Sequence, residues 1–330
     1  MIESQRLQRR AELLASVGWA DATGAPLAGD ASFRSYQRYN QGGQTLVLMD
    51  APPPHEDVRP FAAVGRWLCD NGYAAPQIRA VDAEAGYLLL EDLGDDLFAR
   101  ALSGGAMEEE LYAAAVDVMA DFQGKPVPAF LDPYLLDFLI TEARLFTDWY
   151  APFVAGLDLG AKQIADFEER WRTALAGAMA IGSPVVVLRD YHAENLLWLP
   201  ERSALQRVGL IDFQDALVGS MAYDLTSLLK DIRREVPDAL VEKMLRRYLA
   251  HPVADGLNEH EFRAAFAVIG AQRITKIIGI FSRLSERDDK PGYLDYLPRL
   301  WHLLSVELAH PALTDVAAWF ANTVPPAYRK

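Results

Sequence analysis

Hydrophobic and polar positions in the first part of the chain predict a β-hairpin. The segments 32–39 and 45–50 are short β-like runs, and Asn40-Gln41-Gly42-Gly43 joins them. Glycine accepts the positive φ angles that hairpin loops demand, so the turn chemistry agrees with the strand pattern. The three prolines at 52–54 end the second strand, because proline cannot continue a hydrogen-bonded ladder.

Helical periodicity surrounds this hairpin. Residues 1–19 have the pattern of an opening amphipathic helix, and apolar residues recur at helical spacing over 61–68. The runs 78–81 and 87–90 then predict a second pair of strands. From Gly94 onward the character changes, because nearly every later segment is helical in its spacing.

Two apolar blocks interrupt the helical pattern, at 184–188 and 208–213. The whole pattern predicts an α/β (α+β) fold with two domains. A small mixed α/β lobe covers residues 1–92, and a large, mostly helical lobe covers residues 93–330 and carries one isolated β-hairpin. A connector near residues 91–95 joins the two.

Composition and charge exclude several classes of function. The chain has 330 residues with 46 acidic and 32 basic side chains, and its net charge is 32 − 46 = −14. Such an acidic balance argues against nucleic acid as a partner and, more weakly, against an anionic membrane surface. The single cysteine, Cys69, permits neither an internal disulfide nor a metal site built on several thiolates.

The sequence also favours a cytoplasmic protein without a membrane partner. The N-terminus lacks the apolar stretch and the small-residue cleavage site of a signal peptide. The longest apolar helical segment, 262–284, is interrupted by Arg263, Arg273 and Lys276, so we expect it not to span a bilayer.

The segment 185–198 carries the most informative group of polar residues. An apolar strand leads into Asp190, His192 and Asn195, and Asp212 follows Asn195 by seventeen residues at the end of another apolar run. Two strands that end beside each other would bring Asp190, Asn195 and Asp212 to one rim. Phosphoryl transfer uses such a set: a carboxylate for the attacking hydroxyl, and a carboxylate with an amide oxygen for Mg²⁺.

The motifs Asp190-Tyr-His-Ala-Glu-Asn195 and Ile211-Asp-Phe213 resemble the catalytic loop and the metal-binding aspartate of the aminoglycoside phosphotransferase family, which is related to the protein kinases. The resemblance implies a bilobal, protein-kinase-like fold and the use of ATP with Mg²⁺. It implies that Asp190 is the catalytic base and that Asn195 and Asp212 are the metal ligands. Asp224, in Gly219-Ser-Met-Ala-Tyr-Asp-Leu225, resembles a residue that supports the active site without taking part in the chemistry.

The same resemblance identifies candidate nucleotide-binding residues in the first lobe. The connector Leu88-Leu-Leu-Glu-Asp-Leu-Gly94 is similar to the family's hinge, so the backbone of Glu91, Asp92 and Leu93 is expected to meet the adenine edge. The segment 30–35 is expected to cover the phosphates, with backbone groups and the Ser32 hydroxyl as donors and with Phe33 beside them.

The chain departs from the family pattern because it lacks the lysine that binds the nucleotide phosphates in the family. Met49 stands near the expected position, and the chain has no lysine before Lys125. Arg34 or Arg38 is the candidate replacement, because a guanidinium suits phosphate oxygens. A solvated strand face explains these two arginines equally well. The usual histidine two residues before the aspartate is Leu188 here; in the family that histidine is mostly a scaffold residue, so its loss is compatible with the same chemistry.

A narrower resemblance, to bacterial N-acetylmuramate/N-acetylglucosamine kinases, comes from Gly29-Asp-Ala-Ser-Phe-Arg34, Leu48-Met-Asp-Ala-Pro-Pro53, Ile211-Asp-Phe-Gln-Asp215 and Gly279-Ile-Phe-Ser-Arg-Leu284. It implies phosphorylation of the anomeric (C1) hydroxyl of an amino sugar in peptidoglycan recycling. Candidate acceptor-binding residues are His192 and Glu194 in the catalytic loop, with Lys276 and Arg283 for a sugar carboxylate. His192 is equally compatible with a structural role.

Two other readings stay open at this point. The acceptor could be another small alcohol, such as an aminoglycoside, choline, a homoserine-like amino alcohol or a different sugar. The missing lysine and Leu188 also permit a nucleotide-binding pseudokinase, although the intact set of Asp190, Asn195 and Asp212 speaks against it. The net charge of −14 does not identify the acceptor, because overall charge reports on solubility and on excluded partners.

Overall fold

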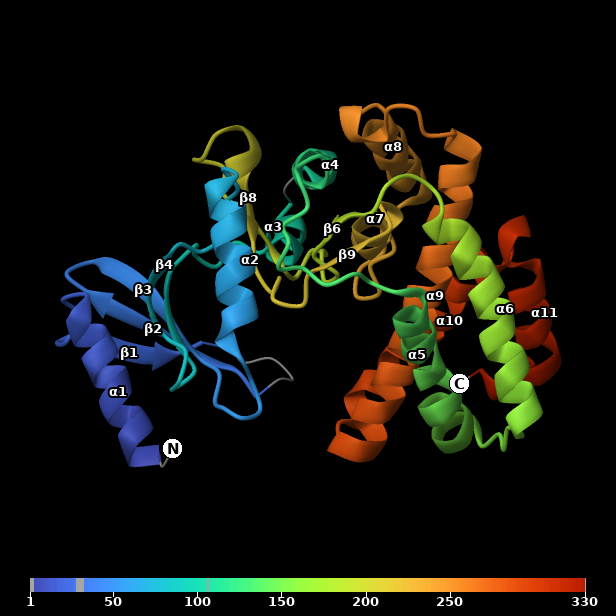
Figure 1. Cartoon of the computed structure of the whole chain (residues 1–330), viewed down its shortest axis with the longest axis horizontal. Coiled ribbons are helices and arrows are strands. Elements are labelled where there is room, and N and C mark those ends of the chain that lie inside the picture. The colour runs from blue at the N-terminus through green and yellow to red at the C-terminus, as the bar shows by residue number, and fades with distance from the viewer. Residues whose placement is uncertain (1–2, 28–32, 106, 330) are drawn as a thin grey trace. The chain divides into compact units, whose positions relative to one another are not determined.

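The computed structural model describes residues 3–27, 33–105 and 107–329, and it divides the chain into two compact units. The first unit contains residues 1–118 and 193–216, and the second contains 119–192 and 217–330 (Figure 1). This division differs from the expected boundary at residue 92. The reason is backbone pairing: Leu97 bridges to Leu197 and Ala74 bridges to Gly209, so the β-hairpin segment at 193–216 pairs with residues of the N-terminal unit.

A five-stranded antiparallel sheet forms the first unit, in the order β1-β2-β3-β5-β4. Both predicted hairpins are confirmed, with Gly42 and Gly43 at positive φ in the first turn. The strands are β1 (Thr23–Pro26), β2 (Ser35–Gln41), β3 (Gln44–Asp50), β4 (Ile78–Asp82) and β5 (Tyr87–Glu91).

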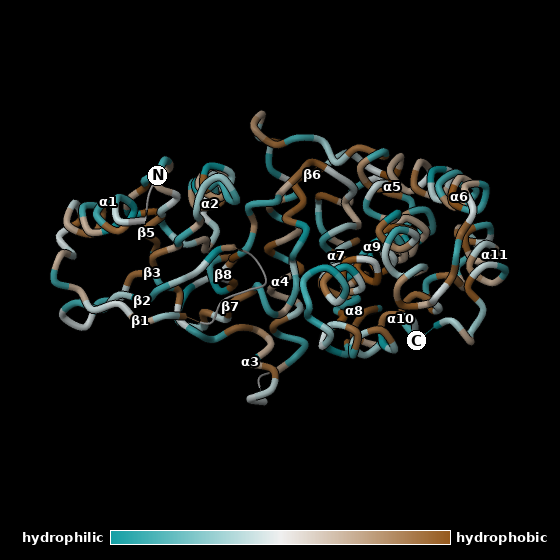
Figure 2. The backbone as a smooth tube through the Cα atoms, turned by 90° about the horizontal axis from the view of Figure 1, so that it is seen from below, coloured by the Kyte–Doolittle hydropathy of each residue, from teal (hydrophilic) through white to brown (hydrophobic). Residues whose placement is uncertain are grey.

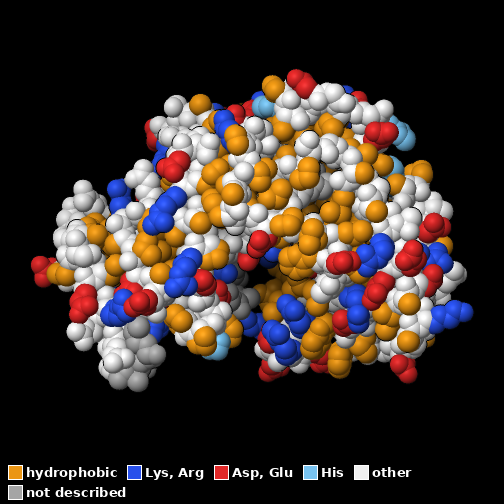
Figure 3. Space-filling model, viewed as in Figure 1, with side chains coloured by type: hydrophobic (Ala, Val, Ile, Leu, Met, Phe, Trp, Pro, Cys, Tyr) orange, Lys and Arg blue, Asp and Glu red, His pale blue; other side chains and the backbone are white. Residues whose placement is uncertain are grey.

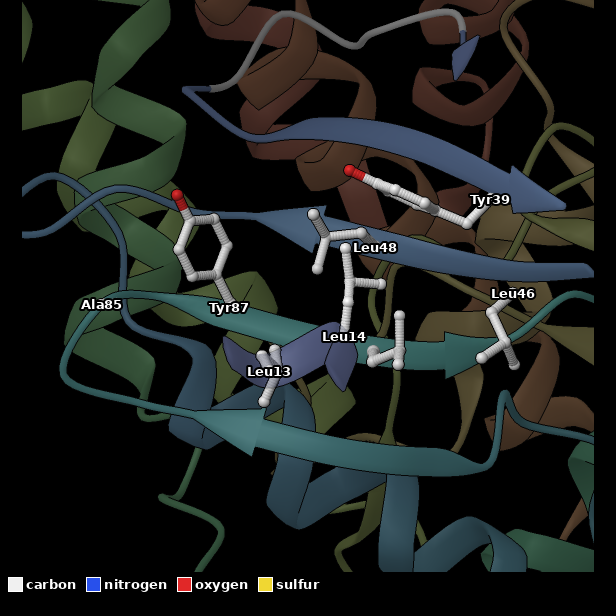
Figure 4. Packing of buried hydrophobic residues seen from close by; sticks show 8 residues of the cluster. Leu13, Leu14, Tyr39, Leu46, Leu48, Ala85 and Tyr87 are labelled. Carbon is white, nitrogen blue, oxygen red and sulfur yellow. The ribbon is translucent and has the colours of Figure 1, made fainter. Parts of the chain in front are cut away.

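The helix α1 (Glu3–Ser16) covers one face of this sheet. Leu13 and Leu14 of α1 pack with Leu46, Leu48 and Tyr87 from the strands, and all five side chains are buried (Figure 4). Alternation along β3 therefore points Leu46 and Leu48 toward α1, whereas Met49 points to the opposite face of the sheet.

The rest of the first unit consists of short elements around a small hairpin. β7 (Leu196–Trp198) pairs antiparallel with β8 (Val208–Leu210), and Leu196 lies opposite Leu210. The helix α2 (Val58–Asp70) begins at Asp57, whose carboxylate accepts a hydrogen bond from the Arg59 backbone N–H at 3.0 Å. The remaining elements are α3 (Phe98–Ser103), the 3₁₀ turn at Ala204–Arg207 and the first part of α4 (Glu108–Gln123).

The second unit is built around one long helix, α9 (Glu259–Asp288). Figure 2 shows α9 among the helices of this unit, and it contacts α5 (Leu136–Leu145), α6 (Ala161–Met179), α7 (Ala222–Leu229) and α10 (Leu297–Leu308). A π-helical segment, Phe146–Ala155, also packs on α9. A Cβ atom at Gly279 would lie 2.2 Å from the Leu145 backbone, so this contact requires glycine.

Length and apolar composition alone would let α9 cross a membrane, and α9 is the one such helix among the described residues. However, 83% of its apolar window is buried inside the protein, which is what the central helix of a folded unit requires.

A second small sheet lies in the helical unit, and it corrects one expectation. β6 (Val185–Val187) pairs with β9 (Leu217–Gly219), whereas the run at 208–213 pairs with β7 in the first unit. After β5, the described residues therefore contain two short two-stranded sheets, β7–β8 and β6–β9, where one isolated β-hairpin was expected. The remaining helices of this unit are α8 (Asp238–Leu249) and α11 (Thr314–Thr323), with 3₁₀ turns at Pro252–Ala254, Pro291–Tyr296, Pro311–Leu313 and Pro326–Tyr328.

Charged side chains are mixed on the visible surface of the protein. Figure 3 shows acidic and basic groups next to one another among exposed hydrophobic side chains. The net charge of −14 is thus not gathered into one acidic patch on this face.

Candidate active site

The β7–β8 hairpin brings two of the predicted functional residues together. Asn195 immediately precedes β7, and Asp212 follows β8 by two residues. The Ile211 backbone N–H donates to the Asn195 carbonyl at 3.2 Å, which extends the ladder to the site. As a result, the Asn195 side-chain amide donates to the Asp212 carboxylate at 3.3 Å.

Asp212 has a strained backbone that its neighbour holds in place. Its φ angle is 59°, in the left-handed region that a residue with a Cβ seldom adopts. The next residue, Phe213, is fully buried and packs on Phe61 of α2, with ring centroids 4.6 Å apart. Gly65 of α2 leaves room for this ring, because a Cβ there would lie 3.3 Å from it. Packing of Phe213 therefore fixes the direction in which Asp212 points.

Two further side chains of the first unit approach the Asp212 carboxylate. Gln214 donates from Nε2 to Oδ1 of Asp212 at 2.9 Å, while Gln214 Oε1 is buried without a hydrogen-bond partner. Arg34 Nη1 lies 3.6 Å from the same Oδ1, and Arg34 Nε lies 3.2 Å from Oε2 of Glu56. Among the described residues, two amides and one guanidinium thus lie close to the Asp212 carboxylate.

This arrangement fits the hard, oxygen-ligated cation that the sequence predicts. A carboxylate, a neighbouring amide oxygen and the buried Gln214 oxygen are hard donors of the kind that Mg²⁺ prefers. Over the described ranges, no group of three or more His, Cys, Asp or Glu side chains could hold a metal alone. A cation at Asn195 and Asp212 would therefore need further oxygens, which nucleotide phosphates provide.

The connector residues lie at the end of β5, and their side chains are held by arginines. Arg202 Nη2 donates to the Glu91 carboxylate at 2.8 Å. Arg38 contacts both Asp92 and Asp95, with Nε 2.7 Å from Asp92 and Nη1 2.8 Å from Asp95. These two carboxylates raise the pKa of the Arg38 guanidinium, Asp95 having the larger effect. Arg38 therefore ties β2 to the connector.

The other predicted nucleotide-binding residues of the first unit are only partly described. Ser32 lies outside the described residues. Phe33 is exposed, and its ring stacks on His55 with centroids 4.7 Å apart. Leu93 lies beside Gly209, where a Cβ would come within 3.3 Å of the leucine side chain. Glycine at 209 thus allows the connector to lie close to β8.

The predicted base, Asp190, belongs to the second unit, where Asp224 supports its loop. Asp224 on α7 is fully buried and accepts two backbone hydrogen bonds, from Leu188 N–H at 2.7 Å and Arg189 N–H at 2.8 Å. Burial raises the pKa of Asp224 to about 7, although these two N–H groups oppose that shift. Arg189, the residue before Asp190, has a φ angle of 71°. The Asp224 carboxylate thus holds a strained turn that presents Asp190.

Cations of the second unit set the charge state of Asp190. The Asp190 side chain is partly exposed, and Arg273 Nη2 of α9 lies 4.0 Å from its Oδ1. Desolvation tends to raise the pKa of Asp190, but Arg273, Lys276 and other nearby cations outweigh it and lower the pKa below its ordinary value. Asp190 is therefore ionised at neutral pH.

A buried carboxylate, Glu142 of α5, binds two of these cations. Its Oε1 lies 2.5 Å from Arg189 Nη2 and 2.8 Å from Lys276 Nζ, and its Oε2 accepts a hydrogen bond from the Tyr134 hydroxyl. Lys276 also donates to the Tyr223 hydroxyl at 3.2 Å. Lys276 is thus engaged inside the protein, which disfavours its predicted role in binding a sugar carboxylate.

His192, Glu194 and Arg283 complete the predicted set. His192 is buried, and burial together with Arg233 lowers its pKa to about 4, so the ring is neutral at pH 7. Glu194, on the first unit, is exposed. Arg283 lies seven residues after Lys276 on the same side of α9, and its Nε is buried without a hydrogen-bond partner.

The sequence and the fold of this chain are similar to those of known proteins. The model of a family described as "Phosphotransferase enzyme family" (APH) matches residues 23–263, which include the Asp190 loop and the Asn195–Asp212 pair. The chain belongs to this phosphotransferase family. The earlier resemblance at the catalytic loop is therefore confirmed.

Individual relatives of this phosphotransferase match over nearly all of its length. The N-acetylmuramate/N-acetylglucosamine kinase of Caulobacter vibrioides is 38% identical, and the match covers 100% of this chain and 99% of the relative. The kinase of the same name from Pseudomonas aeruginosa is 38% identical, with 94% and 92% covered. A solved choline/ethanolamine kinase family protein from Mesorhizobium loti has the same fold, with a TM-score of 0.65, 16% identity, and 95% and 98% covered.

The sequence did not predict the contacts of three charged residues that lie near the candidate site residues or their neighbours in the chain. Arg273 lies in the cationic stretch of α9, but nothing in its spacing marks it as the neighbour of Asp190. Glu142 and Glu56 come from segments without a motif, and only the fold brings them to Arg189 and Arg34. Glu142 lies two residues after Leu139-Ile140 in α5, and an acid within this largely apolar stretch is the one signal that could have found it.

Proposed function

We propose that this phosphotransferase is an ATP- and Mg²⁺-dependent kinase of amino sugars, which transfers the γ-phosphoryl group to the anomeric (C1) hydroxyl of N-acetylmuramate, N-acetylglucosamine or both. The observation that carries the proposal is the contact of Asn195 with Asp212, because this amide–carboxylate pair suits a metal-bound nucleotide. The relatives named as N-acetylmuramate/N-acetylglucosamine kinases support the choice of acceptor.

Residues of the first unit would bind the nucleotide. Backbone groups of Glu91, Asp92 and Leu93 would meet the adenine edge, and Asn195 with Asp212 would hold Mg²⁺ on the phosphates. The bound cation neutralises charge that develops on the phosphate oxygens. Gln214 would orient the Asp212 carboxylate through its 2.9 Å hydrogen bond.

Asp190 would orient the acceptor hydroxyl. Its lowered pKa keeps it ionised, so the carboxylate can accept a hydrogen bond from the hydroxyl and take the proton as the new P–O bond forms. The bond between the γ-phosphorus and the β,γ-bridging oxygen breaks in the same step, and ADP leaves. Positioning and charge neutralisation then supply most of the rate enhancement.

Arg283 is our candidate for the carboxylate of an acidic amino sugar. Lys276 is already paired with Glu142, whereas Arg283 has no ion pair within 4 Å among the described residues, and its Nε is buried without a hydrogen-bond partner. Burial lowers the pKa of Arg283, so a carboxylate partner would be favoured there. We expect Arg283→Ala to weaken turnover of N-acetylmuramate more than that of N-acetylglucosamine.

The matched control for this site is Arg287→Ala, one turn further along α9, because Arg287 is already paired with Asp288. It should change the kinetics of both sugars equally. An Arg283→Ala variant whose kcat/KM falls by the same factor on both sugars would remove Arg283 from the acceptor site.

We further propose that the enzyme works in the cytoplasm, where ATP is available, in the recycling of peptidoglycan sugars. The direct test of the activity is incubation with ATP, Mg²⁺ and a panel of acceptors, followed by assays for ADP and for acid-labile phosphate. The panel contains both amino sugars, their 1-O-methyl glycosides, an aminoglycoside, choline and homoserine.

Anomeric phosphates are acid-labile, so we expect ADP and acid-labile phosphate in equal amounts with the free amino sugars. The methyl glycosides are the matched control, because their C1 oxygen has no proton to lose. Phosphorylation of a methyl glycoside would disprove C1 as the acceptor, and turnover of choline or an aminoglycoside alone would disprove the sugar.

A further inference from the structure

The first unit needs a cation for the nucleotide phosphates, and its sequence offers no lysine. Kinases of this architecture commonly place a lysine on the third strand and pair it with a glutamate from a nearby helix. Here β3 carries Met49 near that position, and the methionine is almost fully buried. A cation from another part of the unit must take its place.

Two other arginines of the first unit are ion-paired with carboxylates away from Asp212. Arg38 is bound by Asp92 and Asp95 of the connector. Arg6 of α1 lies 2.5 Å from Asp50, on the face of the sheet that α1 covers. Arg34 differs, because its guanidinium lies 3.6 Å from the predicted metal ligand Asp212.

Glu56 forms an ion pair with a different nitrogen of the same guanidinium. Arg34 Nε lies 3.2 Å from Oε2 of Glu56, and both side chains are largely buried, with 14% and 18% of their surface exposed. The Glu56 backbone N–H donates to the Pro52 carbonyl at 3.2 Å, so the turn before α2 fixes the carboxylate. A guanidinium has donors on two edges, so one edge can be held by Glu56 while the other faces a phosphate.

We propose that Arg34, oriented by Glu56, binds the β- and γ-phosphates of the nucleotide in place of the missing strand lysine. Arg34 is then a binding residue that comes from the segment before β2, and Glu56 is a positioning residue that acts through it. The inference rests on the proposed function, since it takes a nucleoside triphosphate as the ligand.

The test compares the affinity for ATP with that for adenosine by isothermal titration calorimetry in the presence of Mg²⁺. Arg34→Met should weaken ATP binding at least about tenfold and leave adenosine binding within twofold, because only the phosphates lose a partner. Arg6→Met is the matched control, as it removes a partly buried, ion-paired arginine from the same unit. It should leave the ratio of the two affinities unchanged.

The positioning role of Glu56 is tested by a double-mutant cycle. Glu56→Gln should weaken ATP binding about threefold to fivefold, also without an effect on adenosine. The double variant Arg34→Met/Glu56→Gln should bind ATP no more weakly than Arg34→Met alone, because Glu56 acts only through the arginine. Losses that multiply would show that Glu56 acts independently and would overturn its assignment.

The result separates this inference from the proposed function. A phosphate-specific loss in Arg38→Met, with none in Arg34→Met, would overturn the assignment of Arg34 while ATP binding by the wild type stands. A wild-type protein that binds ATP no better than adenosine and phosphorylates no acceptor would overturn the proposed function itself.

Discussion

The two units surround their candidate carboxylates with different groups. In the first unit, Asp212 accepts hydrogen bonds from the neutral amides of Asn195 and Gln214 and has one guanidinium, Arg34, at 3.6 Å. In the second unit, Asp190 lies 4.0 Å from Arg273, and further cations also lower the pKa of Asp190. Both loops are strained, since Asp212 and Arg189 have positive φ angles.

This difference agrees with the two roles proposed for these carboxylates, which are binding of a metal ion and binding of the attacking hydroxyl group. At Asp212 two amides donate to the carboxylate, and their oxygens are hard donors that a metal bound there could also use. A carboxylate among cations stays ionised and gains little from another cation, so it suits a hydroxyl group better than Mg²⁺. The surroundings of each aspartate thus support the role that the sequence assigned to it.

The largest expected effect comes from Asp190→Asn. The amide cannot accept the proton, and we expect turnover to fall by about 10³–10⁴-fold. Nucleotide affinity should change less than threefold, because the predicted nucleotide site lies in the first unit. Steady-state kinetics and calorimetric titration with ATP measure the two quantities. Retained turnover would show that Asp190 is not the base.

The second prediction concerns the buried carboxylate behind Asp190. Glu142→Ala leaves Arg189 and Lys276 without their carboxylate partner, and we expect the free energy of unfolding to fall by about 3–5 kcal/mol. Urea unfolding of the complete chain measures this. Addition of Lys276→Met to the variant removes one uncompensated charge, so it should restore part of the loss.

A different outcome would contradict the pairing that the structure shows. If the double variant Glu142→Ala/Lys276→Met is less stable than Glu142→Ala alone, an uncompensated charge on Lys276 is not the cause of the lost stability. Lys276→Met alone should cost less than Glu142→Ala, because Glu142 then still has Arg189 as its partner.

The third prediction tests the hydrogen bond from Gln214 to Asp212. Gln214→Leu removes the 2.9 Å hydrogen bond that orients the Asp212 carboxylate, and we expect the Mg²⁺ concentration for half-maximal turnover to rise about tenfold. Magnesium titration at saturating ATP measures it. Lys276→Met serves as the comparison, because it alters the second unit and should leave the Mg²⁺ requirement unchanged. Equal shifts in both variants would refute a specific role of Gln214.

The sequence predicted those parts of the site that local patterns encode. The apolar runs before Asp190 and Asp212, the hairpin glycines and the order of the elements follow from residues close together in the chain. The charged partners near the candidate residues do not follow from local patterns. Glu142, for example, binds Arg189, the neighbour of Asp190, and these two are 47 residues apart. The pairing of β6 with β9 was missed for the same reason: two three-residue apolar runs give no register.

The division between units was missed for a related reason. Hydropathy changes near residue 94, but the β7–β8 hairpin lies 100 residues later and joins the first unit through single backbone bridges. Such bridges leave no signature in composition or period. The pairing of Lys276 with Glu142 likewise leaves no signal in the sequence, since the helical position of Lys276 resembles that of Arg283.

The smallest expected effect concerns pH and the buried ring of His192. Its pKa is about 4 in the folded protein, because burial and Arg233 disfavour a charged ring, and near 6.5 when the chain is unfolded. As the pH falls, His192 therefore binds a proton in the unfolded state before it does so in the folded state. The contribution of His192 to the free energy of unfolding is full above pH 6.5 and is lost as the pH falls toward 4. Between pH 7.5 and 5.5 we expect a loss of about 1 kcal/mol from this residue.

Urea unfolding at the two pH values measures this contribution. His192→Gln has no titrating ring, so its free energy of unfolding should fall by about 1 kcal/mol less than that of the wild type over the same interval. His302→Gln, which replaces an exposed ring of the same unit, is the control and should keep the wild-type slope. A His192→Gln slope equal to that of the wild type would mean that His192 titrates normally, and its neutral, buried role in the second unit would be wrong.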